Sequence, residues 1–121
     1  MIIGIGSDII EVKRIAKALE KESFAKAVFT SEEIAYCESR GAHKYESYAA
    51  RYAAKEAVGK ALGTGLNISD LLEIAVSNNE KGMPQIILSG HTQEKAKKST
   101  AIHVSLSHSA EYAIAQVVLE G

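Results

Sequence analysis

The polar residues that could do chemistry gather toward the end of one predicted helix, residues 47–65. Tyr52, Glu56 and Lys60 stand four residues apart and so share one line on such a helix, and Gly63-Thr64-Gly65 follows them. In one interpretation, Glu56 and Lys60 form an ordinary surface ion pair worth about 0.2–0.5 kcal/mol. In the other, a carboxylate and a cation beside a glycine-rich turn bind a metal-bound phosphate. These residues alone leave both interpretations open.

A second carboxylate, Asp8, follows a predicted strand over residues 2–6. Gly4 and Gly6 within that strand indicate a bulge or the close approach of another backbone. Asp8 and Glu11 have the spacing of a capping box, in which Asp8 would begin the next helix. Alternatively, a carboxylate held at the end of a rigid strand could bind a divalent cation. The local sequence does not decide between a helix cap and a metal ligand.

The helix over residues 47–65 is predicted from its alanine content, because alanine has the highest helix propensity. Ser47 is expected to cap its beginning, and Gly63 or Gly65 to end it in the left-handed conformation. Five alanines follow the spacing of a buried stripe and would let a neighbouring element pack closely. They are Ala50, Ala53, Ala54, Ala57 and Ala61.

The elements before this helix are predicted from periodicity and capping signals. A helix over residues 10–22 carries a basic face, which is either simply solvated or attracts an acidic protein partner. The members of this basic face are Lys13, Arg14, Lys17 and Lys21. A capping box formed by Thr30 and Glu33 predicts a short helix over residues 32–39, and residues 40–46 are expected to form a polar loop.

Two hairpins are predicted in the second half of the chain. Residues 73–77 and 85–89 form the first, a helix over 91–98 follows, and residues 101–107 and 112–119 form the second. In the strand over 101–107, His103, Ser105 and Ser107 share one face. Alternation of this kind is typical of a half-buried strand, so the polar face is either a solvated edge or the wall of a polar site.

The composition is that of a globular protein of 121 residues, expected to form one domain over residues 1–121. A net charge of −1 gives no overall basic field that would attract nucleic acid. The single cysteine, Cys37, excludes an intrachain disulfide and is expected to be a small buried side chain. We expect a reducing, cytoplasmic location, because neither a signal peptide nor an apolar run of about 18–20 residues is present.

Taken together, four motifs resemble the small bacterial holo-acyl-carrier-protein synthases, a group of 4'-phosphopantetheinyl transferases. The most specific is Arg51-Tyr-Ala-Ala-Lys55-Glu56-Ala57 followed by Lys60-Ala-Leu-Gly63-Thr-Gly65. The others are Gly4-Ile-Gly6-Ser-Asp8-Ile with Arg14-Ile15, Phe29-Thr-Ser-Glu-Glu33, and His103-Val-Ser105-Leu-Ser107-His108 with Tyr112-Ala113. They occur in the family's order and cover nearly the whole chain.

This resemblance implies an α+β single domain, with antiparallel sheets and hairpins packed around one long central helix. It implies transfer of the 4'-phosphopantetheine group of coenzyme A to a serine of apo-acyl carrier protein. The reaction would release 3',5'-ADP, depend on Mg²⁺ and support fatty acid biosynthesis. It also implies a homotrimer with active sites between subunits.

The resemblance further assigns roles to residues. Asp8 and Glu56 would bind Mg²⁺, which favours the metal interpretation of Asp8. Lys60 would offset the charge that develops on the bridging oxygen of the pyrophosphate. The serine proton would pass to a metal-bound water, or to Glu56 through that water. Candidate coenzyme A contacts are Arg51, Lys60, Gly63, Gly65, His103, Ser105 and His108. The basic face would bind the acidic carrier protein.

Three departures from the family pattern are present. Tyr52 stands where phenylalanine is frequent, Met83 replaces a lysine between Gly82 and Pro84, and Arg14 is the only arginine of the basic face. Two other functions are compatible with these residues. One is a different Mg²⁺-dependent phosphate-transfer enzyme, and the other is a non-enzymatic oligomeric module that binds acidic proteins.

Overall fold

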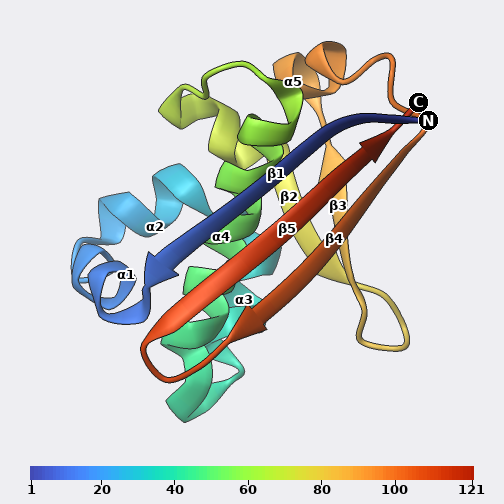
Figure 1. Ribbon diagram of the computed structural model, residues 1–121. Helices are drawn as coiled ribbons and strands as arrows, with labels where there is room; N and C mark the ends of the chain where they lie inside the picture. The colour runs from blue at the N-terminus through green and yellow to red at the C-terminus, as the bar shows by residue number, and fades with distance from the viewer.

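The computed structural model describes residues 1–121 and is organised around one long helix, α4 (Lys44–Leu62), which lies across a three-stranded antiparallel sheet (Figure 1). The sheet has the order β1-β5-β4, formed by β1 (Ile2–Glu11), β5 (Tyr112–Glu120) and β4 (Ala101–His108). A separate hairpin consists of β2 (Ile74–Asn78) and β3 (Pro84–Leu88). The predicted α+β fold with a long central helix is therefore confirmed.

Shorter helices connect these elements. They are α1 (Val12–Ala18), α2 (Glu22–Val28), α3 (Ser31–Glu38), α5 (Gly90–Lys95) and the 3₁₀ helices η1 (Gly41–His43) and η2 (Ile68–Glu73). Both predicted hairpins are present, and no helix is long and apolar enough to cross a bilayer.

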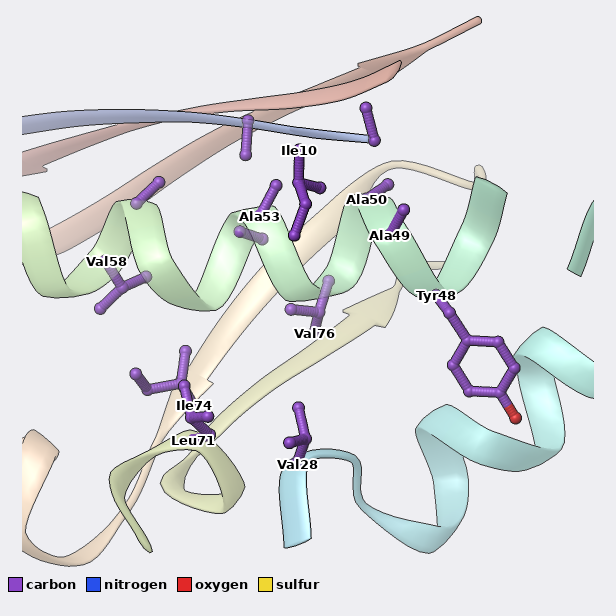
Figure 2. Close-up of a cluster of buried hydrophobic side chains, with 14 of the residues drawn as sticks. Ile10, Val28, Tyr48, Ala49, Ala50, Ala53, Val58, Leu71, Ile74 and Val76 are labelled. Carbon is purple, nitrogen blue, oxygen red and sulfur yellow. The ribbon is translucent and has the colours of Figure 1, made fainter. Parts of the chain in front are cut away.

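The core lies on two sides of α4 (Figure 2). Toward the sheet, Ala50 and Ala53 face Ile10 of β1, and the whole predicted alanine stripe is buried. On the opposite side, Val58 faces Ile74, with Leu71 and Val76 close by. Because alanine side chains are small, the helix backbone can lie close to the sheet. The short distance between α4 and the sheet determines the geometry of the site.

The ends of α4 confirm one prediction and correct two. Gly63 ends the helix with a φ of +74°, as expected for the left-handed cap. Ser47 does not begin it: the helix starts at Lys44 and His43 makes no side-chain cap. The predicted loop over 40–46 was also wrong, because η1 runs directly into α4 and so orders the chain one turn earlier than Ser47.

The beginning of the chain differs most from prediction. Strand β1 continues to Glu11, because it pairs with β5 from Gly4 opposite Leu119 to Glu11 opposite Tyr112. Asp8 therefore lies inside the strand and caps no helix, so its capping interpretation was wrong. The single helix predicted over 10–22 is also wrong, since α1 and α2 are separate helices.

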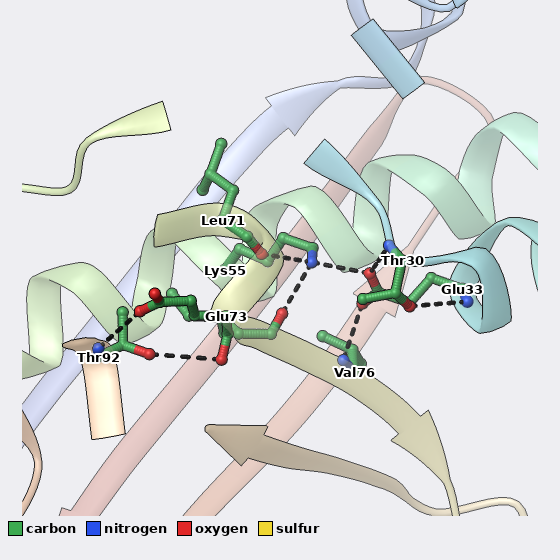
Figure 3. A network of polar contacts seen from close by, with 8 residues as sticks. Thr30, Glu33, Lys55, Leu71, Glu73, Val76 and Thr92 are labelled. Carbon is green, nitrogen blue, oxygen red and sulfur yellow. Dashed lines mark hydrogen bonds and ion pairs between the residues drawn. The ribbon is translucent and has the colours of Figure 1, made fainter. Parts of the chain in front are cut away.

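A buried polar network fixes α4 to the rest of the fold (Figure 3). The predicted capping box is confirmed, with Thr30 N donating to Glu33 Oε1 at 2.8 Å and Glu33 N donating to Thr30 Oγ1 at 3.1 Å. Lys55 Nζ donates to Glu33 Oε1, Leu71 O and Ile74 O, each at 2.8 Å. The network thus joins α3, α4, η2 and β2.

Cys37 is buried as predicted, and burial raises the pKa of its thiol to about 12. At neutral pH the thiol is therefore protonated and a poor nucleophile.

Candidate active site

Asp8 and Lys60 meet where α4 crosses β1. Lys60 Nζ donates to Asp8 Oδ1 at 3.2 Å and to the Ser7 carbonyl oxygen at 3.0 Å. Asp8 is largely covered, with 17% of its side chain exposed, whereas Lys60 is 57% exposed. The cation of Lys60 thus pairs with a carboxylate of another element. The surface ion pair between Glu56 and Lys60, one of the two interpretations of these residues, is not formed.

Gly4 and Gly6 allow this contact, as their predicted role of close backbone approach requires. A Cβ added at Gly6 would lie 2.1 Å from the Ala57 carbonyl oxygen and 3.0 Å from Lys60 Cβ. At Gly4 it would lie 2.1 Å from the carbonyl oxygen of Ala61. Only glycine permits α4 and β1 to come this close, and so brings Lys60 within reach of Asp8.

Tyr52 connects Glu56 with the rest of the site. Its ring is half-buried and packs on Phe24 of α2, with ring centroids 6.3 Å apart. Burial and then the Glu56 carboxylate raise the pKa of the Tyr52 hydroxyl, the Asp8 carboxylate adds to this effect, and Arg14 opposes it. Both carboxylates therefore lie near one hydroxyl group, together with a cation of the basic face.

Two cavities meet at Lys60. The sheet cavity, about 600 Å³, is lined by residues of β1, β4, β5 and α4, among them Ser7, Asp8, Lys60, Ser105, Ser107 and Gln116. The turn cavity, about 370 Å³, is lined by Glu56, Gly59, Lys60, Gly63, Thr64, Gly65 and Leu66. No atom lies within 4 Å of where a Cβ of Gly63 or Gly65 would be, so the backbone of this turn is open to a ligand.

The other predicted coenzyme A contacts divide into two groups. Ser105 lines the sheet cavity with Asp8 and Lys60. His103 instead pairs with Glu120, and His108 Nδ1 lies 3.2 Å from Glu46 Oε2 near the start of α4. Neither histidine lines the two cavities of its own chain.

Arg51 also lies away from both cavities. It is buried, donates from Nη2 to Asn78 Oδ1 at 2.6 Å and stacks over the ring of Tyr36 at 4.1 Å. Its Nε has no hydrogen-bond partner. A single chain therefore gathers Asp8, Glu56, Lys60 and the glycine turn, but not Arg51.

Gln116 is a cavity residue that the sequence analysis did not identify. It stands between Ser7 and Ser105 in the sheet register, and its Nε2 donates to the Gly6 carbonyl oxygen at 3.2 Å. The signal was its place on β5, where it stands between exposed Ile114 and half-buried Val118 on the same face of the strand. A polar residue on such a face is informative only when the neighbouring strands are known.

The basic face is exposed, and it is divided between α1 and the turn before α2. Lys13, Arg14 and Lys17 lie on α1, while Lys21 directly precedes α2. Of these residues, Arg14 lies close enough to Tyr52 to lower the pKa of its hydroxyl group.

The two carboxylates suit a metal that also binds phosphate. No group of three or more His, Cys, Asp or Glu side chains could hold a metal by itself. Mg²⁺ is commonly bound by one or two carboxylates, with substrate phosphates and waters completing its coordination. Asp8 and Glu56, beside an open turn and a lysine, offer donors of this kind.

Comparisons with known proteins identify the family of this chain. Residues 4–117 match the family model of the 4'-phosphopantetheinyl transferase superfamily. A holo-[acyl-carrier-protein] synthase of Clostridium tetani is 48% identical over 100% of this chain and 98% of its own length. One from Treponema denticola is 43% identical, with both chains fully covered.

Solved structures show the same similarity. The holo-(acyl-carrier-protein) synthase of Bacillus anthracis, in complex with coenzyme A (3',5'-ADP), has a TM-score of 0.83 and 41% identity over 100% of this chain and 98% of that one. The Helicobacter pylori enzyme in complex with coenzyme A has a TM-score of 0.82 and 33% identity over 96% and 99%. The chain therefore belongs to the 4'-phosphopantetheinyl transferase superfamily, among the holo-acyl-carrier-protein synthases.

Proposed function

We propose that the protein transfers 4'-phosphopantetheine from coenzyme A to a serine of an apo-acyl carrier protein, in a Mg²⁺-dependent reaction that releases 3',5'-ADP. The observation that carries this proposal is the meeting of Asp8, Glu56 and Lys60 beside an open glycine turn. The coenzyme A complexes of related synthases support the choice of donor. The product would serve as the acyl carrier of fatty acid biosynthesis.

The residues of this chain would act by positioning and by electrostatics. Asp8 and Glu56 would hold Mg²⁺, which supplies charge neutralisation at the phosphate oxygens. The Lys60 ammonium group would offset the negative charge on the leaving oxygen, and the turn over Gly63 to Gly65 would bring backbone amides to a phosphate. The serine oxygen forms the new bond to phosphorus while the bond to the 3',5'-ADP oxygen breaks, and the serine proton leaves to a water that Glu56 orients.

We further propose a homotrimer whose subunits complete each other's sites. The sheet face opposite α4 carries exposed apolar side chains beside its polar ones: Ile5 and Ile9 are each 64% exposed, and Ile114 is 46% exposed. This face borders the sheet cavity, so a second copy packed on it would also cover that cavity. Arg51, His103 and His108 lie outside the cavities of their own chain, and we propose that they contact the 3'-phosphate and adenine end of coenzyme A at a neighbour's site.

The basic face would bind the carrier protein. Lys13, Arg14, Lys17 and Lys21 are exposed and unpaired in a protein of net charge −1. Arg14, which acts on the Tyr52 hydroxyl, would bring an acidic partner to the edge of the site, where its serine must enter.

The test is a Glu56→Gln variant assayed by mass spectrometry of the carrier. We expect the transfer rate to fall at least about 100-fold, because Glu56 would be a metal ligand. The fold and oligomeric state should stay unchanged, because Glu56 lies at the surface of α4 and makes no ion pair. Glu80→Gln, in the exposed turn of the β2-β3 hairpin, is the control and should keep normal activity. A near-normal Mg²⁺-dependent rate in Glu56→Gln would refute the metal assignment. Turnover of a pyrophosphate compound without a carrier would favour a different phosphate-transfer enzyme.

A further inference from the structure

Lys60 pairs with Asp8 in addition to its proposed role toward a phosphate. Its ammonium group lies against Asp8 and the Ser7 carbonyl oxygen, so the cation sits beside the carboxylate that would hold the metal. The Asp8 side chain is only 17% exposed, which leaves little room on it for a further cation. A divalent ion and the ammonium group would also repel each other strongly at such short range.

Lys60 can leave this position without breaking the fold. More than half of its side chain is exposed, and its only hydrogen bonds are those to Ser7 and Asp8. It lines the sheet cavity, which contains Asp8, and also the turn cavity, which contains Glu56 and the glycine turn. A flexible four-carbon side chain can thus place its cation in either cavity.

We propose that Lys60 competes with the metal ion for Asp8, and that coenzyme A relieves this competition by drawing the ammonium group toward its phosphates in the turn cavity. The inference rests on the proposed metal site at Asp8 and deepens it. In the free protein Lys60 holds the affinity for Mg²⁺ low. Metal and coenzyme A then bind cooperatively, since each favours the position of Lys60 that the other needs.

The test is the affinity of the purified protein for Mn²⁺, a paramagnetic substitute for Mg²⁺, measured by water-proton relaxation without coenzyme A. Lys60→Met should bind Mn²⁺ about tenfold more tightly than the unmodified protein, because a cation beside the ion is removed. Lys95→Met is the matched control. Lys95 Nζ donates a hydrogen bond to the Gly65 carbonyl oxygen in the same turn and does not contact Asp8. Loss of the Lys95 cation should therefore change the affinity for Mn²⁺ less than about twofold.

A second measurement repeats the titration with coenzyme A present. Coenzyme A should raise the affinity for Mn²⁺ by a larger factor in the unmodified protein than in Lys60→Met, because only the former gains from the release of Lys60. Equal factors, or an unchanged or weaker affinity in Lys60→Met without coenzyme A, would overturn the inference. An Asp8→Asn variant separates this failure from that of the proposed function. If Asp8→Asn binds Mn²⁺ as well as the unmodified protein does, the metal site itself is misplaced.

Discussion

Lys55 offers a prediction whose size follows from its contacts. Its side chain is fully buried, one residue before Glu56, and all three of its ammonium protons are used: by Glu33, by the Leu71 carbonyl and by the Ile74 carbonyl. Replacing Lys55 with Met keeps the approximate side-chain volume but leaves the Glu33 carboxylate buried without its cation. Removing one partner of a buried ion pair typically costs about 3–5 kcal/mol.

A loss of this size is a large part of the stability of a small domain. For a chain of this length, about 3–5 kcal/mol corresponds to a fall in Tm of roughly 10–20 °C. Calorimetry or denaturant unfolding followed by circular dichroism measures it. Lys97→Met is the control, since Lys97 pairs with Glu94 at 3.3 Å with both side chains largely exposed. Such a surface pair contributes about 0–1 kcal/mol, so the control should lower Tm by no more than a few degrees.

A double-mutant cycle with Glu33→Gln shows whether the loss comes from the pair itself. Each single variant leaves one buried charge without its partner, whereas the double variant leaves none. The double variant should therefore be more stable than the sum of the two single losses predicts, by about 1–3 kcal/mol. Losses that add within about 0.5 kcal/mol, or a Lys55→Met variant as stable as Lys97→Met, would refute the reasoning.

Three further predictions concern other parts of the molecule. Gly6→Ala should destabilise the protein by about 1–3 kcal/mol and slow transfer, because its Cβ would collide with the Ala57 carbonyl oxygen and push α4 away from β1. The control Gly65→Ala, with open space around it, should leave stability unchanged. Equal stabilities of the two variants would argue against a tight contact between α4 and β1. Lys13→Glu with Arg14→Glu should raise the KM for carrier protein about tenfold without changing coenzyme A affinity. The control, Lys97→Glu with Lys98→Glu, should leave the KM for carrier protein unchanged. Equal weakening toward both substrates would exclude a separate docking face. Burial raises the pKa of Tyr48 above its ordinary 10.0 and that of Cys37 from 9.0 to about 12, so both protons are held more tightly in the folded state. Unfolding experiments at a series of pH values should show full stability below about pH 9 and a loss of stability as pH rises beyond it, and this loss should be smaller in Tyr48→Phe. A stability that does not change with pH in this range would contradict these shifts.

Features set by neighbouring residues were predictable from the sequence. The Thr30–Glu33 capping box, the Gly63 helix end and both hairpins follow from side chains a few positions apart, and all are present. The alanine stripe of α4 was predictable for the same reason, because helical periodicity alone determines which positions share a face.

Features set by distant pairing were not predictable. The sequence predicts that the strand ends at residue 6 and that a helix begins at residue 10. Residues 7–11 instead pair with residues 112–116, and this pairing overrides local preference. Lys55 is charged and would be expected at the surface, but Glu33 and two carbonyl groups from later elements compensate its burial.

The candidate site shows the same division. The involvement of Asp8, Glu56 and Lys60 could be inferred from motifs. The sequence left open an ion pair between Lys60 and Glu56, whereas the structure pairs Lys60 with Asp8. That partner depends on how closely α4 approaches Gly4 and Gly6, a distance that no local pattern contains. Gln116 was missed because its place beside Ser7 and Ser105 depends on sheet register.

The most direct test of the proposed activity is the mass of an apo-acyl carrier protein after incubation with this protein, coenzyme A and Mg²⁺. We predict a gain of one phosphopantetheine group on the carrier, with release of 3',5'-ADP, and no gain when EDTA removes the metal. An unchanged carrier mass, with no binding of coenzyme A in the presence of Mg²⁺, would contradict the proposal.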